Sequence, residues 1–292
     1  MSVESSLIIG LALAAASALG TNAGFLFKQR GAVLAPPVRA SHPLRSAGDL
    51  FRSKWFAVGW IVSLGAWGLH VGALSLAPLS TVQAVLSGGL VFLAVLAERC
   101  FGFQLGARQW LGLTITAAGL VIIGLTGSGQ GTHHYSAAAL IAVEGAVFAL
   151  GAGLVRISSH TNFDPRGEAL LLAAAAGVLF GVSDVAVKYL SQAAGPLGLL
   201  SPWTLTALMS FVLSFYASAR SLQIGQAVEV IAITSVTANL AAIIGGILVF
   251  GESIGSGGLG VTARVFAFCL VIAGAALMPA PLRTVSAPPV SL

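Results

Sequence analysis

The stretch EALLLAAAAGVLFGVSDVAVKYL, residues 168–190, decides the fold. No charged residue lies between Glu168 and Asp184, and Lys188 follows Asp184 by one helical turn. An unbroken apolar run of about twenty residues is long enough to cross a bilayer as a helix. The strands of a membrane barrel instead alternate apolar and polar residues over about ten positions. Only these two structures satisfy the backbone in lipid, so the unbroken run predicts a transmembrane helix.

The rest of the chain has the same character. Of its 292 residues, 57% are hydrophobic and 8% are charged, whereas soluble domains carry about 25% charged residues. The chain therefore has too little polar surface for water, and we predict an all-α integral membrane protein with about nine transmembrane helices. The predicted spans are 5–26, 55–76, 79–101, 109–126, 136–155, 169–190, 203–222, 226–250 and 263–281.

The basic residues predict how the chain crosses the membrane. The loop at 28–54 carries six of the 14 Lys and Arg residues. If this loop is cytoplasmic, nine spans place all basic residues on the cytoplasmic side except Lys188 and Arg264, as the positive-inside rule requires. We therefore expect a multi-pass protein of the cell membrane, with its N-terminus outside and its C-terminus in the cytoplasm. The net charge of +5 reflects this topology, so no nucleic-acid partner is expected.

An internal repeat divides the chain. LALAAASALGTNAGFLFK (11–28) aligns without gaps on LLAAAAGVLFGVSDVAVK (171–188), which pairs Lys28 with Lys188. Lys28 lies at the cytoplasmic end of the predicted first span, where we expect it to act as an anchor at the end of the helix. In the predicted orientation the two segments cross the membrane in opposite directions. Inverted repeats are a recurrent architecture of secondary transporters, which hold their substrate between the repeats. We expect a first repeat at 1–126, a linking fifth span at 127–157, a second repeat at 158–282 and a disordered cytoplasmic tail at 283–292.

Three further motifs carry a family resemblance. They are ALSLAPLSTVQAV (73–85), GARQWLGLTITAAGLVIIGL (106–125) and GGILVFGESIG (245–255). In this ordered set the chain resembles the drug/metabolite transporter superfamily, whose members commonly have ten spans in two repeats. One span is missing from the first half, and the basic loop that starts with KQRG (28–31) stands in its place. This resembles the nine-span NIPA-like magnesium transporter branch. Phe103 occupies the position of the family's first Gly-Glu acid, and only Gly251-Glu252 is intact.

Asp184 and Lys188 need an explanation, because a charge at the centre of a bilayer helix costs roughly 2.5–3.5 kcal/mol. The two residues are spaced as a favourable helical ion pair. In one interpretation Lys188 reaches the outer interface and neutralises Asp184. In the other, Asp184 faces a water-filled cavity as a substrate or proton site, and Lys188 tunes it. Gly177 and Gly181 leave one face of the helix bare, which allows either close packing or space for a ligand.

Six more polar residues fall within predicted spans. Glu144 is either a protonated carboxyl bonded to a neighbouring helix or a proton-coupling carboxylate. Glu229 either reaches the interface or lines an inner vestibule. His70, Asn22, Gln83 and Asn239 either hold helices together or line a cavity. These six residues, with Asp184 and Lys188, are our candidates for the substrate or ion pathway.

No catalytic motif, cofactor motif or nucleotide-binding domain is evident, so we expect neither an enzyme nor a cofactor. The leading hypothesis is a secondary transporter of a small molecule or ion, driven by a gradient, with Asp184 and Glu144 as coupling groups. A magnesium transporter is the alternative, since Mg²⁺ is commonly held by one or two carboxylates, here Asp184 with Glu144 or Glu229. Lys188 opposes a divalent-cation site. A membrane scaffold without transport is the third hypothesis, and a homodimer is left open.

Overall fold

The fold is entirely helical over the residues that the computed structural model describes, which are 3–39, 42–125, 137–160, 164–192, 201–251 and 257–277. The predicted tail and Glu252 lie outside them. The helices are α1 (Val3–Val33), α2 (Pro43–Phe51), α3 (Lys54–Leu76), α4 (Leu79–Phe101), α5 (Ala107–Leu125), α6 (Ala137–His160), α7 (Pro165–Gln192), α8 (Pro202–Ile224), α9 (Ala227–Phe250) and α10 (Gly257–Ala276).

The chain is an integral membrane protein. Seven of the described helices are long and apolar enough to cross a membrane. The helices α5 and α10 have 19 and 20 residues, the length that a hydrocarbon core of about 30 Å requires. Together these nine helices agree with the predicted number of spans. Large apolar side chains point outward from the bundle and are more than half exposed, among them Ile8, Ile61, Ile141, Leu208 and Leu259. Such a surface suits lipid.

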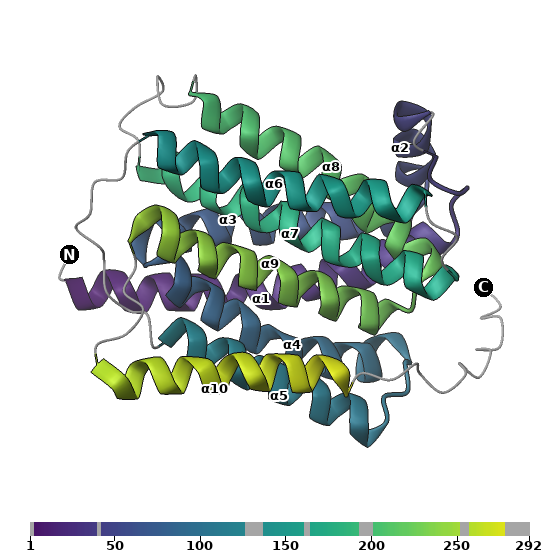
Figure 1. The fold of residues 1–292 in the computed structure, drawn as a ribbon. Coiled ribbons are helices and arrows are strands. Elements are labelled where there is room, and N and C mark those ends of the chain that lie inside the picture. The colour runs from purple at the N-terminus through teal and green to yellow at the C-terminus, as the bar shows by residue number, and fades with distance from the viewer. Residues whose placement is uncertain are drawn as a thin grey trace.

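The spanning helices run alternately in opposite directions (Figure 1). In that view α1, α4, α6, α8 and α10 run from left to right, and α3, α5, α7 and α9 run back. At the right-hand end α1 passes through the short helix α2 into α3. The ends of α1, α4 and α8 and the starts of α5 and α7 lie at this end. These helix ends carry Arg30, Arg99, Arg220, Arg108 and Arg166. We call this end of the bundle the basic end, and the other the neutral end.

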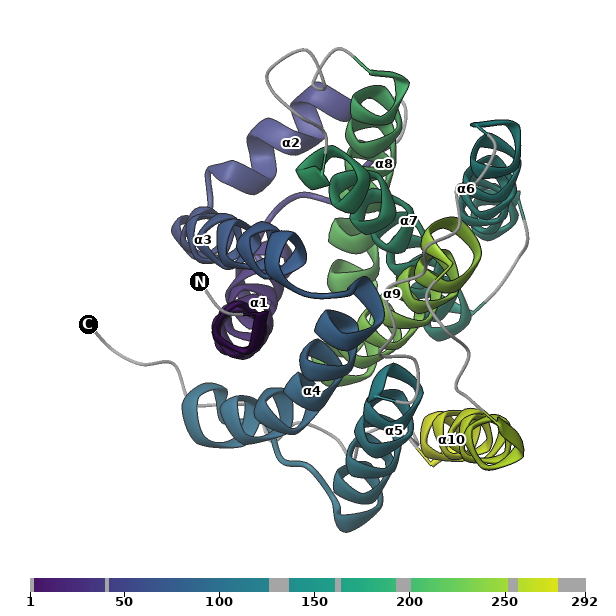
Figure 2. The same cartoon turned by 90° about the vertical axis from the view of Figure 1, so that its left-hand side faces the viewer.

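The helices pack in two similar sets. Helix α1 packs against α3 and α4, as α7 packs against α8 and α9. The sets meet where α4 contacts α9, and α5 packs beside α10 (Figure 2). Each helix of the first set runs opposite to its counterpart in the second. Helix α6 packs on α7 and has no counterpart among the described helices.

The correspondence between the helices of the two sets differs from one expectation drawn from the sequence. By sequence, the loop at 28–54 stands in place of a missing span. In the structure this loop corresponds to the connection between α7 and α8, not to α6. Helix α1 also continues to Val33, beyond the predicted end at residue 26, and part of the loop folds into α2. A helix satisfies its own backbone, so it continues past the end of an apolar run without penalty.

Glycines decide which helix faces touch. A Cβ atom at Gly181 would lie 2.5 Å from Ala241 Cβ and 2.9 Å from Ala238 O, both on α9. A Cβ atom at Gly177 would overlap Thr237 of the same helix. Small residues spaced by one turn let helix backbones approach closely. The bare face of α7 is therefore a packing surface, and of the two alternatives drawn from the sequence, close packing is the one observed.

Candidate functional site

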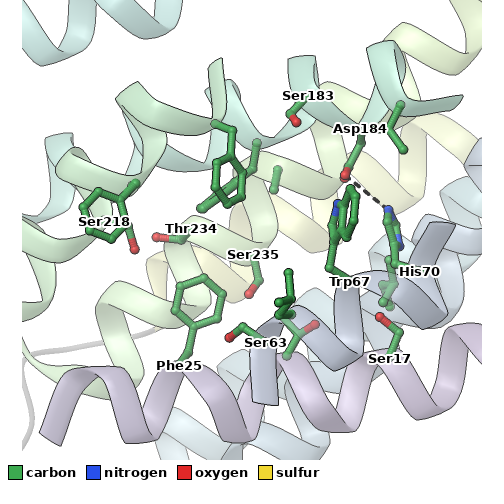
Figure 3. Close-up of a pocket in the computed structure, with 18 of the residues that line it drawn as sticks. Ser17, Phe25, Ser63, Trp67, His70, Ser183, Asp184, Ser218, Thr234 and Ser235 are labelled. Carbon is green, nitrogen blue, oxygen red and sulfur yellow. Dashed lines mark hydrogen bonds and ion pairs between the residues drawn. The ribbon is translucent and has the colours of Figure 1, made fainter. Parts of the chain in front are cut away.

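A cavity of about 570 Å³ lies between the two sets of helices. Its lining comes from α1, α3 and α4 of the first set and from α7, α8 and α9 of the second. Most of the wall is apolar and aromatic, with Trp60 and Trp67 on α3 facing Phe180 on α7 and Phe211 on α8. Polar groups are few, which is typical of a pocket for a small ligand. Figure 3 shows part of this lining, with Phe25, Trp67 and Asp184 labelled.

Asp184 lies at one end of the cavity, toward the neutral end of the bundle. His70 Nε2 on α3 lies 3.2 Å from Asp184 Oδ1, and Gln83 Nε2 on α4 donates to Oδ2 at 3.0 Å. An ionised carboxylate only accepts hydrogen bonds, so His70 can donate to an ionised Asp184 only from a protonated Nε2. The Asp184 side chain is 21% exposed, whereas that of His70 is 7% exposed. The carboxylate is thus held by two helices of the first set and still faces the cavity.

A chain of hydrogen bonds continues behind Asp184. The Ser87 hydroxyl donates to Gln83 O at 2.6 Å, and Asn239 Nδ2 donates to Ser87 Oγ at 2.8 Å. Because Asn239 belongs to α9 and the other two residues belong to α4, this chain joins the two sets at their contact. Gln83 and Asn239 also line the cavity. They therefore fill both roles that the sequence allowed, helix contact and cavity lining.

Asn22 on α1 also combines the two roles. Its Nδ2 donates to Ala18 O at 2.8 Å and to Gly89 O at 3.0 Å, which ties α1 to α4. Asn22 lines the cavity, and its Oδ1 is buried without a hydrogen-bond partner in the described part of the chain. The same holds for Gln83 Oε1 and Ser63 Oγ. The cavity wall therefore retains unused hydrogen-bonding capacity.

Lys188 has a different environment from the one predicted. Its ammonium donates to Leu74 O at 2.5 Å and to Ala77 O at 2.7 Å, where α3 ends and α4 begins. The residue is 4% exposed and is not part of the cavity lining. The last carbonyls of a helix lack intrahelical donors and carry partial negative charge. Lys188 supplies donors to them from inside the protein, instead of extending to the outer interface.

The two glutamates lie away from the cavity. Glu144 on α6 is buried, and its Oε2 has no hydrogen-bond partner in the part of the chain that the structure describes. Glu229 near the start of α9 accepts a hydrogen bond of 2.6 Å from Arg166 Nη2 at the basic end. Neither residue lines the cavity with Asp184. Over the described ranges, no group of three His, Cys, Asp or Glu residues could hold a metal ion.

Lys28 is a lining residue that the sequence did not single out. Its Nζ lies 3.9 Å from the centroid of the Phe25 ring and 5.8 Å from that of Trp60. The alignment of Lys28 with Lys188 gave it the role of an anchor at the end of a helix. Since α1 continues to Val33, Lys28 lies more than one turn inside the helix. The cluster of aromatic residues that follows at 51–60 is the feature of the sequence that could have indicated Lys28 as a lining residue.

Comparison with known proteins gives one informative match. The chain is 23% identical over 280 residues to a protein of Arabidopsis thaliana described as "Probable magnesium transporter NIPA9". The alignment covers 92% of this chain and 81% of the plant protein. No family model matches the sequence, and no solved structure matches it.

Proposed function

We propose that this chain is a secondary transporter that moves a small solute across the membrane by alternating access. The main support is the position of Asp184, whose carboxylate faces a cavity built from both sets of helices. Intramembrane carboxylates are costly and commonly mark substrate or ion pathways. A scaffold would instead bring such a charge into a closed helix contact. The similarity to a probable magnesium transporter also supports transport.

The architecture suggests how the transporter moves. In inverted-repeat transporters one repeat rocks against the other around a site near the midplane. We infer that α1, α3, α4 and α5 form one unit of a drug/metabolite transporter fold, and that α7 to α10 form the other. The positive-inside rule places the basic end in the cytoplasm and the start of α1 outside the cell. The cavity then lies on the boundary between the moving units.

A flux assay in proteoliposomes tests the proposal. The probes are Mg²⁺, detected by an entrapped indicator, and a radiolabelled panel of amines, carboxylates and amino acids, with and without a pH gradient. We expect Asp184→Asn to abolish the flux of whichever probe the wild type carries. The matched control is Asp164→Asn, which alters an exposed aspartate just before the same helix. Normal flux through Asp184→Asn would remove Asp184 from the pathway.

Glu144 keeps its proposed role in proton coupling. It is a buried carboxyl group with an unpartnered oxygen, on the helix that packs against the Asp184 helix. If Glu144 carries the coupling proton, Glu144→Gln will transport at the same rate with and without a pH gradient. If the variant still responds to the gradient as the wild type does, coupling belongs to another group.

Magnesium transport is the second candidate, and the name of the plant relative favours it. Mg²⁺ keeps several waters and is commonly bound through one or two carboxylates, so hydrated Mg²⁺ could be held at Asp184. The aromatic wall and the ammonium of Lys28 both oppose it. Mg²⁺ flux that Asp184→Asn abolishes would establish this candidate. An organic solute that moves while Mg²⁺ does not would exclude it.

A further inference from the structure

Lys28 places its side-chain amino group in the cavity wall, and among the described residues it has no counter-ion. Its ammonium lies over the Phe25 ring and near Trp60. Within the described residues no carboxylate pairs with it and no hydrogen bond reaches it. An aromatic face attracts a cation but accepts none of the three hydrogen bonds that an ammonium donates. Lys28 therefore has donors left for a ligand.

Asp184 and Lys28 stand at opposite ends of the cavity. A Cβ atom at Gly59 would lie 2.6 Å from Lys28 N, so Lys28 is level with Gly59 on α3. His70, which contacts Asp184, lies eleven residues further along the same helix, a rise of about 16 Å. The Lys28 side chain turns back by about one turn to reach Phe25. Along the helix axes the two groups are therefore at least about 11 Å apart.

The wall between these charges is mostly apolar. The Phe25 and Phe180 rings are in edge contact at 6.4 Å, and Phe180 contacts Phe211 at 6.3 Å. Figure 3 shows the hydroxyls of Ser63, Thr234 and Ser235 along this stretch. A ligand that satisfies the whole cavity thus needs a cationic end, an anionic end and a hydrocarbon segment between them.

We propose that the cavity binds an elongated zwitterion, with its ammonium at Asp184 and its carboxylate at Lys28. Each ion pair occupies about 2.8 Å, so the charged atoms of the ligand lie at least about 5–6 Å apart. This separation exceeds that in an α-amino acid, whose charges cannot reach both residues. A metal cation or a simple amine would leave Lys28 uncompensated. The proposal rests on the transporter function above, and it names the substrate class of that same cavity.

A binding assay on the full chain in lipid nanodiscs tests this proposal. Trp60 and Trp67 line the cavity, so tryptophan fluorescence reports occupancy. The probes are glycine, aminobutanoate and aminohexanoate, each with its amino group at the chain end, together with hexylamine and hexanoate. We expect affinity to rise from glycine to aminohexanoate, and aminohexanoate to bind at least about tenfold more tightly than either singly charged analogue, because charge-assisted hydrogen bonds are strong.

Variants of Lys28 and Asp184 show which end of the ligand each residue binds. Lys28→Gln should reduce aminohexanoate to the affinity of hexylamine, whereas Lys28→Arg should retain the advantage of the zwitterion. Asp184→Asn should reduce aminohexanoate to the affinity of hexanoate. Equal binding of glycine and aminohexanoate by the wild type, or no saturable binding of the series, would overturn the proposal without any variant. An unchanged preference in Lys28→Gln would also overturn it.

Counterflow of labelled aminohexanoate in proteoliposomes separates this proposal from the transporter function. Binding with the expected length dependence, but without counterflow, would leave the zwitterion site standing and would overturn transport. Flux of another probe, without zwitterion binding, would overturn the site and leave transport standing. Counterflow that Lys28→Gln slows at least about tenfold would support both.

Discussion

His70 on α3 and Asp184 on α7 join the two sets of helices at the cavity, with Nε2 and Oδ1 3.2 Å apart. Hydrogen bonds to a charged group contribute about 1.5–3 kcal/mol to stability. We expect His70→Ala to lower the free energy of unfolding by about 1–2 kcal/mol. In a double-mutant cycle with Asp184→Asn, the two effects should couple by at least about 0.5 kcal/mol.

Thermal unfolding of the four proteins in one detergent measures this coupling. Thr114→Ala is the control, because its exposed hydroxyl donates to Trp110 O of the same helix α5, so it should not couple to Asp184→Asn. Additive effects of His70→Ala and Asp184→Asn would mean that the contact between His70 and Asp184 contributes no net stability.

Lys188 is expected to act as a structural residue. Removal of its ammonium in Lys188→Met leaves Leu74 O and Ala77 O short of a donor in a buried corner. Each such group costs about 1–3 kcal/mol, so we expect a loss of about 2–5 kcal/mol in the free energy of unfolding. Lys188→Arg keeps the donors and should lose less. If Lys188 served as the counter-ion of Asp184, removal of both charges would restore stability, and that result would contradict this role.

The number of spans could be predicted from the sequence, because lipid leaves the backbone little choice but a helix. The exact ends of the spans could not be predicted. The polar KQRG segment suggested that α1 ends before it, but a helix can continue into water and α1 reaches Val33. That difference of about two turns is why Lys28 resembled an anchor in the sequence and is a lining residue in the structure.

The candidate site, too, could be predicted from the sequence only in part. Asp184 and Glu144 are each the one carboxylate in an apolar span, although a basic residue follows only Asp184 by one turn. Asp184 faces the cavity and Glu144 lies on the peripheral helix α6, because helices far apart in the chain decide what each side chain meets. The alternatives for Lys188 could not be decided by sequence either, since its partners are carbonyls more than a hundred residues away.

Gly177 is expected to tolerate no side chain. A Cβ atom there would overlap Thr237 on α9, so even Gly177→Ala forces α7 and α9 apart. Overpacking of this kind costs about 1–3 kcal/mol, and thermal unfolding should show the loss. The matched control is Gly153→Ala on α6, where the new methyl group meets nothing within 4 Å. Since alanine favours helices by about 1 kcal/mol over glycine, the control should be neutral or stabilising. A stable Gly177→Ala protein would contradict the close packing.

Gln223 on α8 fastens the segment between α1 and α2 at the basic end. Its Oε1 accepts a hydrogen bond of 2.8 Å from Val38 N, and its Nε2 donates to Ala32 O at 3.1 Å and to Pro36 O at 2.9 Å. These bonds join the first set of helices to the second. We expect Gln223→Ala to release the segment and to open the cavity toward the basic end, where Lys28 lies.

Cysteine labelling can measure that opening. Ser218 lines the cavity near the basic end, so Ser218→Cys reports access once the exposed native Cys100 and Cys269 are replaced by alanine. We expect Gln223→Ala to speed labelling by a charged thiol reagent by at least about fivefold, since loss of even one neutral hydrogen bond shifts a local equilibrium by about 1 kcal/mol. Gln226→Ala, which alters an exposed glutamine three residues later and directly before α9, is the control and should not change the rate. Equal rates in Gln223→Ala and Gln226→Ala would mean that the contacts of Gln223 do not hold the basic end closed. A faster rate in Gln223→Ala alone would identify Gln223 as part of the gate on that side, because the bonds it loses are those that tie one set of helices to the other.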